Sequence, residues 1–328
     1  MSDVWLIDRY DESREMRALR LALGIRGVTA EILDWKEITP IGAPPGLLRN
    51  GVPCHPPKAA FLESRVFTRH SEGDLALLYD WLEILEEAGT RLYNPLAALR
   101  RGRNKIRQAY SLARAGLPVP LTRAIRCTDD LERCLEDWGE VVIKPVFGHA
   151  SLDVVHMRAG GPGAERGSRL GMREEIISWH LLRRHGLLVA QQYIENPGRD
   201  MRITVLGGEV ASCVYHVSTA PDQTVRHFLY PLRWEKAPLT AEIANIAGKA
   251  VRTLGLEIAV LDMLEGPEGP IIIEVNCTGS IWARIEGTDM DLTSGGITAI
   301  IADRLVELVN GSMFNGAARL MTESTSST

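Results

Sequence analysis

The sequence predicts a mixed α/β and α+β protein with more than one domain. A strand, a helix and a strand follow one another at 4–7, 13–23 and 29–33, which is the order of a βαβ unit. Antiparallel hairpins are predicted at 200–216 and 258–276, where short Gly-containing turns join β-branched runs. A length of 328 residues also exceeds one domain of ordinary size.

The composition is typical of a globular protein, with 45% hydrophobic and 24% charged residues. A net charge of -5 gives no electrostatic reason to expect a nucleic-acid or membrane partner. The first residues carry charges inside their apolar run, and no run is long enough to cross a bilayer, so neither a signal peptide nor a membrane span is expected. The five cysteines form no Cys-x-x-Cys pair, so we expect reduced thiols in a cytoplasmic protein.

We expect an N-terminal α/β domain over residues 1–93. After the βαβ unit, residues 41–57 are rich in Pro and Gly and are expected to form a loop. A short strand at 59–62 and an amphipathic helix at 75–88 complete this part. No Gly-x-Gly-x-x-Gly follows the first strand, which makes a dinucleotide site there improbable.

A second domain is expected over residues 94–185. Its predicted helices are 104–115, 129–138 and 174–185. Between the second and third of these helices, residues 141–146 read as a strand that contains Lys144. Burying an unpaired ammonium is costly, so Lys144 needs a partner, which is either a phosphate or a structural carboxylate.

The third domain is expected over residues 186–318. Strands are predicted at 188–194, 200–206 and 209–216, and helices at 240–255 and 298–309. The last residues, 319–328, are small and polar and are expected to be disordered.

The hairpin at 258–276 carries the most informative polar residues. Glu274 and Asn276 are two apart on a strand, so their side chains share one face. Asp262 ends the partner strand, and pairing would bring it near both. Two carboxylates and an amide oxygen suit Mg²⁺ carried by a nucleotide phosphate. A polar sheet face without a ligand is the alternative.

The order of these parts resembles the ATP-grasp superfamily. Within it the likeness is to RimK-type amino-acid (alpha-L-glutamate) ligases, especially those that add glutamate to tetrahydromethanopterin-like cofactors. The resemblance covers residues 1–316 and implies an ATP-grasp fold, with an N-terminal pre-ATP-grasp domain and two ATP-binding lobes. The motifs that carry it are Asn94-Pro, Asn104-Lys105, Ala115-Gly-Leu-Pro-Val-Pro120, Thr122, Val-Val-Ile-Lys144-Pro, Gln-Gln-Tyr-Ile194, Asp200-x-Arg202 and Asp262…Glu274-x-Asn276.

The resemblance also implies the cofactors, ATP with Mg²⁺ or Mn²⁺, and the residues that bind them. Lys105 and Lys144 would contact the phosphates of ATP. Gln192, Tyr193 and Ile194 would form the hinge that holds adenine through backbone groups, with Asp200 near the ribose and Arg202 beside it. The metal ligands would be Asp262, Glu274 and Asn276.

The phosphate-handling parts depart from the pattern of that family. The loop after the strand lysine is usually rich in Gly and Ser but keeps one glycine here. Its closure over the phosphates would rely on the amides of Ala150 and Ser151, the Ser151 hydroxyl and His149. The usual Arg-x-Asn element is missing, and Arg226 or Arg233 would take its place. Arg284 is a candidate to pair with a carboxylate of the incoming amino acid, and a surface arginine is the equal alternative.

The implied function is an ATP-dependent carboxylate–amine ligase that acts through an acyl phosphate. It would add glutamate or another amino acid to a small-molecule cofactor precursor such as a pterin, with a homo-oligomer or a paralogue complex left open. The changed loop supports a second hypothesis, a catalytically weakened ATP-grasp protein that binds nucleotide or regulates an active paralogue. The retained lysines and metal residues favour the ligase. The third hypothesis is an α/β protein whose acidic strands bind no nucleotide.

Overall fold

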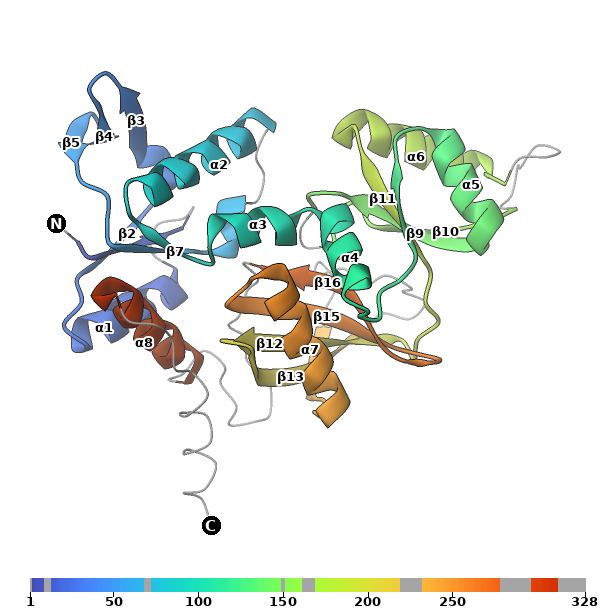
Figure 1. The fold of residues 1–328 in the computed structure, drawn as a ribbon. Coiled ribbons are helices and arrows are strands. Elements are labelled where there is room, and N and C mark those ends of the chain that lie inside the picture. The colour runs from blue at the N-terminus through green and yellow to red at the C-terminus, as the bar shows by residue number, and fades with distance from the viewer. Residues whose placement is uncertain are drawn as a thin grey trace, which may run out of the picture.

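The computed structural model describes residues 2–8, 13–67, 72–148, 151–160, 169–218, 232–277 and 296–311. In this part of the chain the strands form three larger sheets and one small one. Figure 1 shows the N-terminal sheet on one side of the molecule and the other two large sheets on the opposite side, with α3 and α4 between them. None of the helices in these ranges is long and apolar enough to span a bilayer.

The N-terminal sheet is parallel, with the strand order β2-β1-β6-β7. Its strands are β1 (Val4–Ile7), β2 (Ala30–Leu33), β6 (Ala59–Leu62) and β7 (Arg91–Tyr93), and its helices are α1 (Arg14–Ile25), α2 (Glu72–Glu87) and α8 (Gly296–Asn310). Side chains alternate across β1, so Leu6 packs with α1 and α8 while Ile7 packs with α2. Helices thus cover both faces, as the predicted βαβ start requires.

The expectation of a loop over 41–57 is wrong. The segment follows a short helix, η1 (Trp35–Glu37), and forms the antiparallel strands β3 (Ile38–Gly42), β4 (Pro45–Arg49) and β5 (Val52–Cys54). Asn50-Gly51, with positive φ at both residues, makes the tight turn between β4 and β5. Pro40 and Pro53 lie on the two edge strands, where a missing N–H is tolerated.

The second sheet is antiparallel, with the order β10-β9-β11-β8. Its strands are β8 (Thr122–Ile125), β9 (Glu140–Pro145), β10 (Val155–Arg158) and β11 (Leu188–Gln192). The helices α5 (Thr128–Trp138) and α6 (Met172–His185) cover the face that carries Val141, Ile143 and Ala190. The opposite face carries Lys144, because side chains alternate along β9.

The third sheet is five-stranded and antiparallel, with the order β14-β13-β12-β15-β16. The strands are β12 (Arg199–Leu206), β13 (Glu209–Ser218), β14 (Leu232–Lys236), β15 (Ile258–Gly266) and β16 (Gly269–Asn276). Helix α7 (Ala241–Leu254), which Thr240 caps as predicted, covers the apolar face that includes Ile203, Leu261 and Val275. Both predicted hairpins are confirmed.

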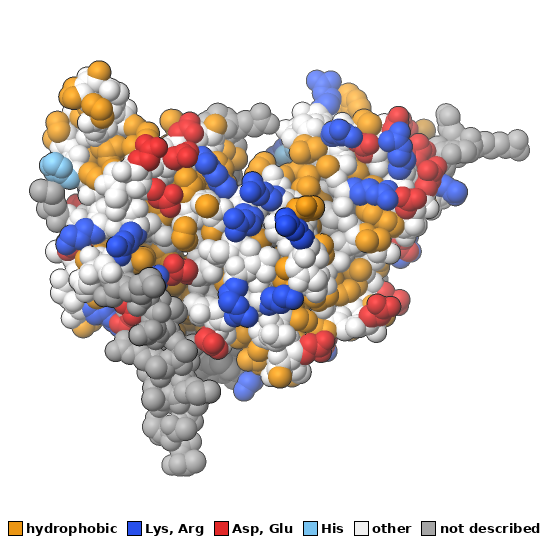
Figure 2. All heavy atoms as spheres, in the orientation of Figure 1, with side chains coloured by type: hydrophobic (Ala, Val, Ile, Leu, Met, Phe, Trp, Pro, Cys, Tyr) orange, Lys and Arg blue, Asp and Glu red, His pale blue; other side chains and the backbone are white. Residues whose placement is uncertain are grey.

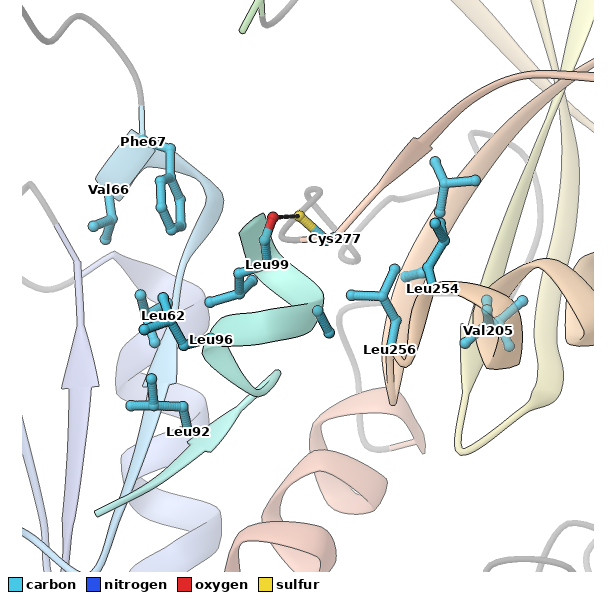
Figure 3. Close-up of a cluster of buried hydrophobic side chains, with 14 of the residues drawn as sticks. Leu62, Val66, Phe67, Leu92, Leu96, Leu99, Val205, Leu254, Leu256 and Cys277 are labelled. Atoms are coloured by element: carbon cyan, nitrogen blue, oxygen red, sulfur yellow. Dashed lines mark hydrogen bonds between the residues drawn. The ribbon is translucent and has the colours of Figure 1, made fainter. Parts of the chain in front are cut away.

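Two helices join the N-terminal sheet to β16. They are α3 (Leu96–Arg103) and α4 (Lys105–Arg114). Asn104 caps α4 by accepting the backbone N–H groups of Ile106 and Arg107. The short helix η2 (Ser64–Phe67) lies earlier in the chain, directly after β6. Figure 3 shows Leu96 of α3 beside Leu62 of β6 and the carbonyl of Leu99 facing Cys277, just beyond β16. Gly102 permits this approach, because a Cβ there would lie 3.1 Å from the Cβ of Cys277.

The net charge of -5 is unevenly distributed over the surface. Figure 2 shows Lys and Arg side chains gathered over α3, α4 and α7. Basic residues of these helices include Arg100, Arg101, Arg107 and Arg252. Of these helices, α3 and α4 contact β16, the strand that carries Glu274 and Asn276.

Candidate active site

The polar residues of the five-stranded sheet share its face opposite α7. Arg202 of β12 stands directly opposite Asp262 of β15, which in turn stands opposite Glu274 of β16. Asn276 is two residues further along β16 and points to the same side. The sheet therefore brings the predicted Asp262, Glu274 and Asn276 together, with Arg202 beside them.

This alignment depends on a β-bulge. Next to the turn, Gly266 pairs with Gly269, and the same register pairs Met263 with Ile272. If this register continued, Ile273 would stand opposite Asp262. The register shifts between Asp262 and Met263, so that Glu274 takes that place instead. Without the extra residue, the two carboxylates would lie on opposite faces of the sheet.

Lys105 connects this site to the loop that follows β9. Its ammonium lies 2.9 Å from Glu274 Oε1 and donates a hydrogen bond to the carbonyl of Gly148 at 3.1 Å. Its backbone N–H donates to the carbonyl of Val146. Desolvation alone would raise the pKa of Glu274, but the charges of Lys105 and Lys144 outweigh it and hold the pKa below its ordinary value.

Lys144 reaches the same strand from the second sheet. It is buried, and its Nζ donates to the carbonyl of Ile273, the extra residue of the bulge, at 3.3 Å. Burial lowers the pKa of Lys144 from 10.5 to about 8, although Glu274 opposes this effect. The partner that the sequence demanded is thus a backbone carbonyl, with carboxylates nearby.

Asp262 is held by two neighbours. Arg202 Nη1 lies 3.1 Å from its Oδ1, and the Asn276 side-chain amide donates to its Oδ2 at 2.9 Å. Burial raises the pKa of Asp262, and Arg202 offsets this only in part. Lys105 therefore places positive charge beside Glu274, and Arg202 places positive charge beside Asp262, as a divalent cation would. Carboxylate and amide oxygens are the ligand types that suit Mg²⁺ arriving with a nucleotide.

Asp200 lies on the same face, two residues before Arg202. It is buried and faces His216, whose Nδ1 is 3.3 Å from its Oδ2, and the ring of Trp234 meets His216 edge-on at 4.1 Å. The Nε2 atom of His216 is buried and has no hydrogen-bond partner in the described chain. The sequence pattern does not reveal His216, because a second bulge, between Thr204 and Val205, brings it opposite Asp200.

The predicted hinge lies where β11 ends. Tyr193 stacks on His156 at 4.2 Å between ring centroids, and Ile194 approaches the turn of the β15–β16 hairpin so closely that a Cβ on Gly266 would lie 3.2 Å from its Cγ2. The side chain of Gln192 points to the face covered by helices, since it alternates with Gln191. Gln191 shares the face of Lys144 and donates to the Thr122 hydroxyl at 3.3 Å.

Of the four candidate catalytic residues, the structure describes Arg233 alone and does not bring it to this site. Arg233 pairs in register with Val217, so it points to the face opposite Trp234 and Asp262, where it is mostly exposed and contacts Glu235. His149, Arg226 and Arg284 lie outside the described residues.

Two buried amides that sequence analysis did not place at the site fix the ends of its strands. Asn94 accepts the N–H groups of Glu257 and Ile258 and donates to the carbonyls of Ile258 and Cys277. Gln108 makes a reciprocal pair of hydrogen bonds with the backbone of Val275. No local sequence signal marks Gln108, because its role depends on which strand packs against α4.

Comparison with known proteins identifies the family of the chain. A family model described as "RimK-like ATP-grasp domain" matches residues 102–300. The tetrahydromethanopterin:alpha-L-glutamate ligase of Methanosarcina acetivorans is 35% identical over 189 residues, which are 57% of this chain and 58% of the relative. The ribosomal protein bS6–L-glutamate ligase of Salmonella newport is 29% identical over 215 residues, 64% of this chain and 67% of the relative.

Solved structures share the fold over almost the whole chain. The ATP-grasp ligase PsnB, in complex with a minimal precursor, has a TM-score of 0.65 at 20% identity and covers 94% of this chain and 99% of its own. The D-cycloserine synthetase DcsG also has a TM-score of 0.65, at 21% identity, over 92% of this chain and 99% of its own. These matches confirm the predicted fold, and the family model covers more than half of the residues. The chain belongs to the RimK-like ATP-grasp family.

Proposed function

We propose that this protein is an ATP-dependent carboxylate–amine ligase that joins glutamate to an acceptor molecule. One observation carries the proposal: Lys105 and Lys144, from a helix and from a separate sheet, both reach the strand that presents Glu274 opposite Asp262. Two ammonium groups beside paired carboxylates form a site that suits both the phosphates and the metal of a nucleotide. Named relatives of the chain are ligases.

In this proposal the residues divide between phosphates, metal and base. Lys105 and Lys144 bind the phosphates of ATP, while Asp262, Glu274 and Asn276 hold Mg²⁺ or Mn²⁺, which supplies charge neutralisation to the transferring phosphoryl group. Arg202 orients Asp262 and lowers the pKa that burial raises. The backbone of residues 192–194 holds adenine, and Asp200, fixed by His216, accepts from the ribose.

The reaction has two steps. A carboxylate oxygen of one substrate attacks the γ-phosphorus of ATP, the bond to the β-phosphate oxygen breaks, and ADP leaves. The nitrogen of the second substrate, as a free amine, then attacks the acyl carbon, and phosphate departs with the bonding electron pair. The chain contributes position and charge: Lys105 and Lys144 stay close to the oxygens on which negative charge accumulates.

The acceptor is proposed from the relatives. The 35% identical relative is named for tetrahydromethanopterin and the 29% identical one for ribosomal protein bS6, so a small molecule such as a pterin is the first candidate and a protein the second. We also propose a cytoplasmic location, and domain bounds at residues 93, 185 and 318. The separate sheets support the first two bounds, whereas α8 packs against the N-terminal sheet. The terminal segment 319–328 lies outside the described residues.

The test is ADP release with ATP, Mg²⁺, L-glutamate and a panel of acceptors that includes a tetrahydropterin and a peptide ending in glutamate. We expect release that requires both the amino acid and one acceptor, with a product heavier by one glutamyl residue. Lys144→Met should abolish it. A protein that binds MgATP but releases no ADP with any acceptor would instead support a nucleotide-binding partner of an active paralogue.

A further inference from the structure

The strand that carries Glu274 and Asn276 lies at the edge of its sheet. β16 pairs with β15 on one side only, so the outward N–H and C=O groups of β16 need partners from elsewhere. A bulge at Ile273 also interrupts the ladder at this point. The position of the two side chains is therefore not fixed by the sheet alone.

Side chains and one loop carbonyl supply the missing partners. Ile272 N–H donates to the carbonyl of Pro118 at 2.9 Å, and the carbonyl of Ile273 accepts from Lys144. The carbonyl of Cys277 accepts from Asn94 at 2.8 Å. Between these contacts stands Val275, whose two outward groups are both bound by Gln108.

Both ends of the Gln108 amide make hydrogen bonds. Its Oε1 accepts the N–H of Val275 at 2.9 Å, and its Nε2 donates to the carbonyl of Val275 at 2.7 Å and to the carbonyl of Gly102 at the end of α3. The side chain is buried, with 4% of its surface exposed. A buried amide with all of these bonds satisfied holds its partners in one arrangement, since the loss of any bond leaves an unpaired polar group.

Gln108 lies three residues after Lys105, and both side chains project from one side of α4 toward β16. Lys105 contacts Glu274, and Gln108 binds the backbone of Val275, the residue between Glu274 and Asn276. A single turn of helix therefore sets where the proposed phosphate lysine stands relative to both proposed metal ligands on this strand.

We infer that Gln108 is a positioning residue for the metal site: it acts through the backbone of Val275 to hold Glu274 and Asn276 in register with Asp262. This inference rests on the proposed function. Gln108 binds the backbone of Val275 and none of the proposed metal-ligand side chains, and its loss lets the bulged edge strand shift, so the metal ligands converge less closely. Groups that hydrogen-bond to metal-ligating side chains change metal affinity about 10- to 100-fold when they are removed, and we expect the lower end of this range for Gln108, which acts through the backbone.

The test compares the wild type with Gln108→Met, which keeps the length of the side chain and removes its hydrogen bonds. The control is Leu112→Ala, which weakens the packing of α4 at a buried position and leaves the contact with Val275 in place. For each protein, Mg²⁺ is titrated at fixed ATP, and the Mg²⁺ concentration that gives half of the ATP-dependent rise in Tm is measured.

We expect this concentration to rise about tenfold for Gln108→Met and less than about twofold for Leu112→Ala. Mn²⁺, which such sites bind more tightly than Mg²⁺, should restore much of the loss. If Gln108→Met does not fold, Gln108→Asn replaces it, because this side chain keeps the amide and is one methylene too short to span the same contacts.

The outcomes distinguish a failure of the proposed function from a failure of the positioning role of Gln108. A wild type without any Mg²⁺- and ATP-dependent rise in Tm would overturn the proposed function. A wild type that shows the rise, with Gln108→Met needing no more Mg²⁺ than the wild type, or with Leu112→Ala shifted equally, would overturn the positioning role of Gln108.

Discussion

The ammonium of Lys105 lies 2.9 Å from Glu274 Oε1, with 8% of the lysine side chain and 23% of the glutamate side chain exposed. Lys105, the first residue of α4, thereby neutralises a carboxylate on an edge strand that lies far away along the sequence. In the absence of nucleotide, this contact compensates the charge of the carboxylate that we propose for Mg²⁺. Arg202 does the same for Asp262.

A double-mutant cycle tests that pairing. Lys105→Met should lower the free energy of unfolding by about 2 kcal/mol, because it leaves a desolvated carboxylate without its cation. In a Glu274→Gln background, Lys105→Met should lower the free energy of unfolding by less than half as much, since no carboxylate is left without its cation. Urea unfolding of the four proteins measures the coupling. Strictly additive effects would show that the two residues do not interact in solution.

The pH dependence of ATP binding follows from Lys144. Its pKa in the folded protein is about 8, lowered from 10.5 by burial, so the ammonium loses its proton in the folded chain before it does in the unfolded chain. Between pH 8 and 10.5 the unfolded chain binds more protons, and this group's contribution to stability rises with pH. A bound phosphate restores the charge, so ATP binding above pH 8 should take up a proton and weaken as the pH rises.

Calorimetric titration with ATP at pH 9, in two buffers of different ionisation enthalpy, measures that uptake. We expect up to about one proton for the wild type. Lys144→Arg supplies the control, because a guanidinium stays charged at this pH. Equal heats in both buffers for the wild type would mean that Lys144 does not change its protonation on binding.

Asn94 gives a prediction about stability. It is fully buried and uses its amide for four hydrogen bonds that hold the start of β15 and the end of β16. Asn94→Asp keeps the acceptor but turns an oxygen toward the carbonyls of Ile258 and Cys277. We expect a loss of about 3 kcal/mol or more near pH 7.

That loss should shrink at low pH. A carboxyl surrounded by carbonyls has a raised pKa in the folded state, so its destabilising effect sets in as the pH rises above the unfolded value and is relieved when the group is protonated. Chemical unfolding at pH 4 and pH 7 checks this. Asn310→Asp, at an exposed position in α8, should change stability by less than about 0.5 kcal/mol.

Much of the fold could be predicted from local pattern. The βαβ start, the hairpins at 200–216 and 258–276, and the Thr240 cap follow from periodicity and turn chemistry, and the structure confirms them. The small sheet at 38–54 was missed, because the Asn50-Gly51 turn signal was outweighed by the prolines around it.

The sequence predicts that Asp262, Glu274 and Asn276 lie close together, but it does not predict the strand register that brings them there. Counting back from the turn of the last hairpin places Ile273 opposite Asp262, and counting from Gly207-Gly208 places Tyr215 opposite Asp200. In each hairpin a bulge shifts the register by one residue, which brings Glu274 and His216 to the polar face. Bulges depend on how strands pack, as does the contact between Gln108 and Val275, and neither leaves a local sequence pattern.

The most direct test of the account measures the Tm with and without ATP and Mg²⁺ for three proteins: the wild type, Glu274→Gln, and Glu268→Gln at the exposed tip of the same hairpin. A ligand that binds only the folded state stabilises it by about 2.7 kcal/mol at one hundred times its Kd. We predict a rise in Tm that requires both ATP and Mg²⁺, persists in Glu268→Gln, and is lost or strongly reduced in Glu274→Gln. A wild type that shows no rise, or a Glu274→Gln variant stabilised as much as the wild type, would contradict a MgATP site at Glu274.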